Sequence, residues 1–92
     1  MYNRFSEMRR RYLREHKDGI YTGMLLTEKL DGHLKEIGES AQIMFDCLVE
    51  QMKKAEGVTE QLKAENQMEW VGRMNSIRSR AEEAVLNDLI YN

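Results

Sequence analysis

Proline is absent from this 92-residue chain, and cysteine occurs once. The absence of proline removes the residue that most often interrupts a helix. The single cysteine, Cys47, excludes an internal disulfide and fits a reducing compartment. No apolar run exceeds three residues, which excludes a membrane-spanning helix, and no apolar secretory segment follows the charged N-terminus. We therefore expect a protein that stays in the cytoplasm.

What the chain does contain is charge and strong helix formers. Charged residues make up 33% of the sequence, and the stretches between its six glycines are rich in good helix formers. No alternating pattern indicates a strand. The sequence predicts an all-α fold and a single domain over residues 1–92, with a basic helix at about 3–16 and an acidic helical body at about 18–92. A chain this short buries only about 60 to 65% of its unfolded surface, so the core is expected to be thin.

The longest helical pattern covers residues 30–55, and the rest of the chain is expected to pack around it. Its apolar side chains fall within an arc of about 140°, which is wide enough to be covered by two or more neighbouring helices. Asp31 is the predicted N-terminal cap and Gly57 the predicted stop. Gly38 is the weak point, where we expect the helix to bend or break. The apolar arc consists of Leu30, Leu34, Ile37, Ala41, Met44, Phe45, Leu48, Val49 and Met52.

A second long helix is predicted after Asn66, where Asn66 and Glu69 form a capping-box pattern. Its apolar arc is as wide as the first and contains Trp70, Val71, Met74, Ile77, Ala81, Ala84, Val85 and Leu89. We expect the two long helices to form an antiparallel hairpin. At 1.5 Å per residue they would be about 36 to 39 Å long, against about 32 Å for a compact globule of this size. Part of the hairpin should protrude, and a protruding apolar stripe favours a homodimer.

Two shorter helices are predicted before the hairpin. Asn3 can cap a helix that ends near His16, and Asp18 begins a short helix that we expect to be mostly buried. Between the long helices, Thr59 is expected to start one or two helical turns. At the C-terminus Leu86, Ile90 and Tyr91 point away from the apolar arc, so we expect the N-terminal helices or another subunit to cover them.

Charge is divided unevenly along the chain. Residues 1–17 carry a net charge of +4 and the remainder carries −6. Five cations form one side of the first predicted helix, which we call the basic face: Arg4, Arg10, Arg11, Arg14 and Lys17. Two interpretations stay open, since these side chains could contact nucleic-acid phosphates or could pair with the acidic body. The aromatic residues of this helix are expected to face the core. Arg9 projects from the apolar side and is expected to snorkel past the core edge or to meet a carboxylate.

Other polar residues are candidate sites. His33 and Glu36 resemble half of a helical metal site, but the inward stripes of the helices are apolar, which favours a helix-start histidine that contacts a carboxylate or backbone. Asn75 is expected to satisfy a buried hydrogen bond. Cys47 lies away from the apolar arc with no base to activate it. We expect no catalytic site, no cofactor and no metal.

Several stretches of the chain, taken together, form a combination found in one known family: Met8–His16, Leu25–Leu26, Lys29–Leu30, His33–Ile37, Thr59–Ala64, Trp70–Asn75, Ala81–Glu83 and Leu89–Tyr91. In their order and spacing they resemble the transposon-encoded TnpV-like proteins of bacterial mobile elements. The resemblance covers nearly the whole chain and implies a small accessory protein with no established biochemical activity. Two features depart from the family pattern: the segment that commonly precedes the arginine-rich helix is expected to be missing, and Gly32 and Gln67 occupy positions where prolines often open the long helices.

The sequence therefore supports two hypotheses. The first is a non-enzymatic accessory or regulatory protein of a mobile element that contacts nucleic acid through the basic face. The second is a protein-binding module or inhibitor whose acidic surface engages a basic partner such as a nuclease or recombinase.

Overall fold

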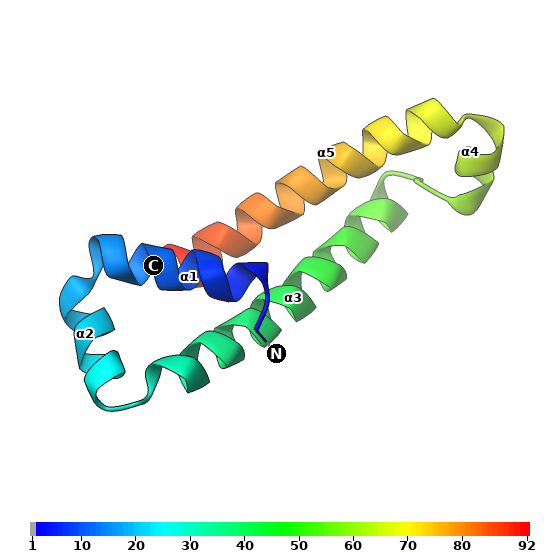
Figure 1. Cartoon of the computed structure of the whole chain (residues 1–92). Helices are drawn as coiled ribbons and strands as arrows, with labels where there is room; N and C mark the ends of the chain where they lie inside the picture. The colour runs from blue at the N-terminus through cyan, green and yellow to red at the C-terminus, as the bar shows by residue number, and fades with distance from the viewer. Residues whose placement is uncertain (1) are drawn as a thin grey trace.

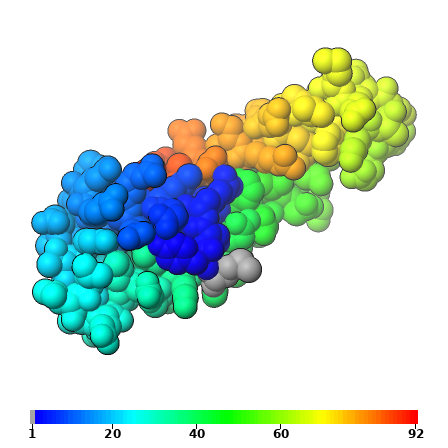
Figure 2. Space-filling model, in the orientation of Figure 1, coloured from blue at the N-terminus to red at the C-terminus, as the bar shows by residue number. Residues whose placement is uncertain are grey.

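The computed structural model describes residues 2–92, and these residues form helices joined by short connections, with no strand among them. The all-α prediction is confirmed for this part of the chain. The molecule is elongated, with extents of 55 × 21 × 18 Å, and Figures 1 and 2 show its two ends built from different segments. The elements are α1 (Arg4–His16), α2 (Asp18–Leu26), α3 (Leu30–Ala55), α4 (Glu60–Glu65), α5 (Gln67–Val85) and a π-helical turn, η1 (Leu86–Ile90).

Three predicted helix starts and one predicted stop are confirmed. Asn3 caps α1 by accepting hydrogen bonds from the amides of Phe5 and Ser6. Thr59 and Asn66 cap α4 and α5 in the same way. Gly57 follows α3 with a φ of 66°, the left-handed conformation that glycine adopts without steric cost. The sequence predicted these caps and this stop because each depends on residues that are neighbours in the chain.

The start of α3 differs from the prediction. The helix begins at Leu30, so Asp31 lies in its first turn instead of capping it, and no side chain caps this end. The reason is the tight turn after α2, in which Glu28 has a φ of 60° and the Lys29 amide donates to the carbonyl of Met24 at 2.9 Å. A left-handed non-glycine residue costs about 1 to 2 kcal/mol and has no sequence signature here.

The helix does not break at Gly38, which is one of the two outcomes predicted there, since α3 is uninterrupted through this residue. Gly38 is buried where the start of α1 crosses α3. The Asn3 side-chain amide donates to the Gly38 carbonyl at 3.1 Å, and the buried Ser6 hydroxyl donates to the Leu34 carbonyl at 2.8 Å. Tertiary contacts at this crossing therefore outweigh the low helix propensity of glycine.

The core consists of three separate clusters along the length of the molecule. One joins α1, the middle of α3 and the C-terminus through Phe5, Ala41, Val85 and Ile90. The second joins α1 to the start of α3 through Leu13, Leu30 and Leu34, with partly buried residues of α2 beside it. The third lies at the α4 end and contains Val58, Met74 and Ile77.

The prediction that the second short helix is mostly buried is wrong. No residue of α2 is buried, and Leu26 is 78% exposed. Only Tyr21 and Met24 are partly buried, against the second cluster. The helix has apolar side chains on every side, but it contacts the molecule along one side only.

The sequence predicts that either the N-terminal helices or another subunit covers the C-terminal end, and the structure shows the first of these. Ile90 is fully buried in the cluster that contains Phe5 of α1, and the rings of Tyr91 and Tyr12 are 5.4 Å apart. The N-terminal helix therefore covers this end. None of the helices between Tyr2 and Asn92 combines the length and the apolar character needed to cross a bilayer.

Candidate nucleic-acid interface

The basic face is presented by α1, and the contacts of α1 fix its orientation. Phe5 and Leu13 are fully buried, and Ser6 is buried and bonded to the α3 backbone. These residues set the inner side of the helix, so the arginines lie on the outer side. Figure 2 shows α1 on the surface, over α3 and beside the end of α5.

Arg4 is the first of the five predicted residues, and its charge is used within the molecule. Its Nη1 atom lies 3.1 Å from Oε1 of Glu82 in α5. The guanidinium carbon also lies 4.6 Å from the ring centroid of Phe5 and 5.0 Å from that of Phe45. Arg4 thus ties α1 to α3 and α5 and follows the interpretation of pairing with the acidic body.

Arg10 is also engaged, more weakly. It pairs with Glu7 one turn earlier in α1 at 3.7 Å, one of the two pairings that the helical spacing allows. The pKa of Arg10 is raised, chiefly through a hydrogen bond with the Tyr21 hydroxyl of α2. The Arg10 side chain is therefore paired within α1 and lies close to α2.

Arg11, Arg14 and Lys17 form the remainder of the basic face, and we call them the three unpaired cations. All three are exposed. Within residues 2–92 their side chains make no ion pair, hydrogen bond or ring contact. The structure thus divides the predicted set into two internally engaged residues and three that face solvent.

Arg9 is expected either to snorkel past the core edge or to meet a carboxylate, and in the structure it contacts backbone oxygens and a histidine. Its Nη1 atom donates to the carbonyl of Ile90 at 2.7 Å and to the backbone oxygen of Asn92 at 3.1 Å, and its Nε atom donates to Nε2 of His33 at 3.3 Å. Carbonyls at the end of a helix lack internal partners and carry partial negative charge, which explains their attraction for a cation. Arg9 therefore holds the C-terminus against α1.

His33 has a partner that the sequence did not indicate. It meets Arg9 in place of a carboxylate or backbone group. Burial, followed by the nearby Arg9 charge, lowers the pKa of His33, while Glu36 acts in the opposite direction. No group of three potential metal ligands occurs in the part of the chain that the structure describes.

Two other candidates are also placed by the structure. Asn75 is exposed, so the predicted buried hydrogen bond is wrong. The error arose because α5 is covered on one side only at this level, where Met74 and Ile77 are buried and Asn75 is not. Cys47 is exposed, as its place outside the apolar arc predicted, and receives a 3.6 Å hydrogen bond from Gln51.

The aromatic residues of α1 do not all face the core. Phe5 is buried, but Tyr12 is only partly buried, and its ring lies 5.1 Å from the ring of the exposed His16. Together with Tyr91 these two residues form what we call the aromatic group. The group borders a surface depression that is also lined by Met8, Arg11 and Glu15. Sequence reasoning missed it because Tyr91 comes from the opposite end of the chain.

In a comparison with protein families, the family model described as transposon-encoded protein TnpV matches residues 1–90. The chain belongs to this TnpV family. The resemblance noted in the sequence is thereby confirmed, and the protein is transposon-associated. Searches of curated proteins and of solved structures gave no match.

The TnpV match includes all five residues of the basic face, and its last residue is Ile90, just before Tyr91.

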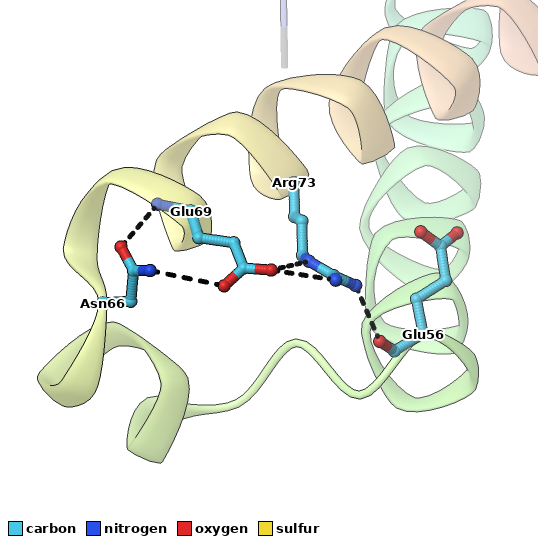
Figure 3. A network of polar contacts seen from close by, with 4 residues as sticks. All are labelled: Glu56, Asn66, Glu69 and Arg73. Atoms are coloured by element: carbon cyan, nitrogen blue, oxygen red, sulfur yellow. Dashed lines mark hydrogen bonds and ion pairs between the residues drawn. The ribbon is translucent and has the colours of Figure 1, made fainter.

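The match also includes the opposite end of the molecule, which carries a different polar network (Figure 3). There Arg73 contacts the Glu69 carboxylate at 3.0 Å and the Glu56 carbonyl at 3.5 Å. The Asn66 side chain accepts a hydrogen bond from the Glu69 amide. Arg80 pairs with the Glu56 carboxylate at 2.8 Å, and this interaction lowers the pKa of Glu56. Each of these arginines has an acidic partner, so the network holds α3 and α5 together at this end.

Proposed function

We propose that this TnpV family protein is a non-enzymatic accessory protein of a transposon or related mobile element, and that it contacts nucleic-acid phosphates through α1. One observation carries the proposal: Arg11, Arg14 and Lys17 are exposed on one side of a helix and have no partner of their own among residues 2–92. Phosphates are strong hydrogen-bond acceptors for guanidinium groups and attract ammonium groups.

The scaffold in this proposal is one antiparallel hairpin formed by α3 and α5. Its support comes from the clusters: Val49 and Met52 late in α3 pack with Met74 and Ile77 near the middle of α5, and Ala41 packs with Val85. The hairpin gives α1 a long surface to lie on. The wide apolar arc of α3 requires this third helix on its other flank.

The predicted test is a filter-binding titration against nonspecific duplex DNA. Each neutralised phosphate contributes about −0.9 to the slope of log affinity against log salt, so three contacts give a slope of about −3. The combined variant Arg11→Gln, Arg14→Gln, Lys17→Gln should lose this binding. A control with the same charge change, Lys35→Gln, Lys54→Gln, Arg78→Gln, removes exposed cations from α3 and α5 and should keep it.

The outcomes separate the two functional hypotheses. Equal loss in both triple variants would mean that total charge and not α1 governs binding. If the unaltered protein retains neither duplex nor single-stranded DNA even at low salt, the proposal is wrong, and the alternative of an acidic surface that engages a basic protein partner gains support.

We further propose a homodimer through α2. Ile20, Leu25 and Leu26 are 54%, 54% and 78% exposed, and residues 19–27 contain no charged side chain. In a two-fold interface each patch meets itself, so charged residues near the axis would face like charges. This uncharged patch avoids that repulsion, and we therefore assign it a second copy of the chain as its partner.

Light scattering over a wide concentration range tests the dimer. The unaltered protein should show twice the monomer mass, and Leu26→Glu should return it to the monomer mass because a charge would be buried in each copy. Met68→Glu is the matched control, since Met68 is 86% exposed in α5, far from α2. A monomer mass at all concentrations would refute the dimer.

A further inference from the structure

The aromatic group beside the three unpaired cations has its own geometry. The ring centroids of Tyr12 and His16 are 5.1 Å apart with an interplanar angle of 35°, and those of Tyr12 and Tyr91 are 5.4 Å apart with an angle of 44°. These are distances of ordinary aromatic contact. Three rings from two ends of the chain therefore form one connected surface.

This surface is open to solvent, unlike the aromatic contact at the other end of α1. Tyr91 is 48% exposed and His16 is exposed, whereas Phe5, which contacts Phe45, is fully buried. Burial in the core accounts for the Phe5 contact. It does not account for Tyr91, which leaves nearly half of its surface in water at an unfavourable hydrophobic cost.

Tyr91 is nevertheless held in place. Its amide donates to the Leu86 carbonyl at 2.8 Å, and the preceding residue, Ile90, is fully buried. Arg9 binds the backbone oxygens on both sides of Tyr91, those of Ile90 and Asn92. The ring is thus presented from a backbone that is fixed on α1, and a ligand would not have to order a loose tail.

The rings border a depression of about 360 Å³ that has polar groups at its edge. Arg11 supplies a cation and Glu15 supplies a carboxylate, and both are exposed. A carboxylate accepts hydrogen bonds from the amino and imino groups of nucleobases, and a guanidinium binds the adjoining phosphate. Rings, acceptor and cation together match an unpaired nucleotide better than a duplex, because base pairing and stacking cover these base surfaces in a duplex.

We propose that this depression binds an unpaired nucleobase against Tyr91 and Tyr12, so that the preferred ligand of α1 is a single-stranded nucleic acid. The inference rests on the proposed function, since Arg11, Arg14 and Lys17 bind the phosphates on either side. Stacking of bases on aromatic side chains next to a basic groove is the usual basis of single-strand binding without sequence preference.

The test compares a labelled 12-nucleotide single strand with a 12-base-pair duplex by fluorescence anisotropy at the same low salt. The single strand should bind about tenfold more tightly, and Tyr91→Leu should remove about tenfold of that affinity while leaving duplex binding unchanged. Tyr91→Trp keeps an aromatic surface and should retain single-strand binding. Tyr2→Leu is the control, because Tyr2 is a 41% exposed tyrosine that precedes α1 and lies outside the aromatic group, and it should have no effect.

The outcomes separate the single-strand inference from the proposed binding of phosphates by α1. Equal affinity for both ligands, unchanged by Tyr91→Leu, would overturn the single-strand inference and leave phosphate binding by α1 intact. Loss of binding in Tyr91→Trp as well as Tyr91→Leu would also overturn it, since the ring surface would not be what matters. Failure to bind either ligand would overturn the proposed function itself.

Discussion

The two ends of this molecule differ in how many of their side chains are buried in core clusters. At the end formed by α1, α2, η1 and the first half of α3, which we call the three-layer end, two of the core clusters lie one after the other. At the far end, formed by α4 and the adjoining parts of α3 and α5, there is one cluster. The buried residues of α3 show the contrast directly, because all of them, Leu30, Leu34, Gly38 and Ala41, lie in its first half.

The polar contacts of the two ends differ in the same direction. At the three-layer end, side chains of α1 bond to backbone groups far along the chain, as Ser6 does with Leu34 and Arg9 with Ile90. At the far end, exposed ion pairs predominate, and the buried indole N–H of Trp70 has no acceptor. The wide apolar arc of α3 is therefore fully used only where a third helix covers it, and the candidate binding surface lies on that third helix.

The same truncation made at both ends provides the largest expected difference. Leu34→Ala should lower the free energy of unfolding by about 3 kcal/mol, since Leu34 is 1% exposed and its removal leaves a cavity. Leu62→Ala in α4 should cost about 1 kcal/mol, because Leu62 is only partly buried. Urea denaturation followed by circular dichroism measures both. Equal losses would show that the far end is packed as well as the three-layer end.

A polar comparison should give a smaller difference. Ser6→Ala removes the hydroxyl that donates to Leu34 in the core and should cost about 1 kcal/mol, and Ser6→Cys, with a weaker donor of similar size, should recover part of it. Arg80→Gln breaks an ion pair at the surface of the far end and should shift the urea midpoint less than Ser6→Ala does. The opposite ranking would mean that the far end depends on its ion pairs.

The sequence predicted the features that depend on local spacing. The all-α class, the caps at Asn3, Thr59 and Asn66 and the left-handed Gly57 were all visible in runs of a few residues. The direction of the apolar arc of α3 was also predicted correctly, since Ile43 lies outside the arc and is 71% exposed. The errors at α2 and Asn75 concern which neighbour covers a given side, and that is decided by tertiary packing.

The candidate site shows the same limit. The helical pattern identified all five cations of the basic face, but it could not tell that Glu82, 78 residues away, engages Arg4. It also could not bring Tyr91 to Tyr12, because the π-helical turn at η1 ends the regular helix just before Tyr91. Contacts between remote segments thus decided which predicted residues are available for binding.

The smallest predicted effect is a difference in how the two ends respond to acid. Burial and Arg9 hold the pKa of His33 below its usual 6.5, so the unfolded chain takes up this proton more readily than the folded chain does. His33 therefore contributes stability above about pH 6.5 that is lost as the pH falls through its lowered pKa. Glu56 at the far end also has a lowered pKa, from Arg80, but its contribution is lost only below its usual 4.5.

Thermal unfolding between pH 8 and pH 2 should resolve these two steps. His33→Gln keeps an acceptor for Arg9 and cannot be protonated in this range, so it should flatten the change that begins below pH 6.5 and leave the decline below pH 4.5. Glu56→Gln should do the reverse. His16→Gln, which removes the exposed histidine of α1, is the matched control for the loss of a histidine side chain. If the loss of stability between pH 6.5 and pH 4.5 survives in His33→Gln, the contact between Arg9 and His33 does not couple the three-layer end to pH.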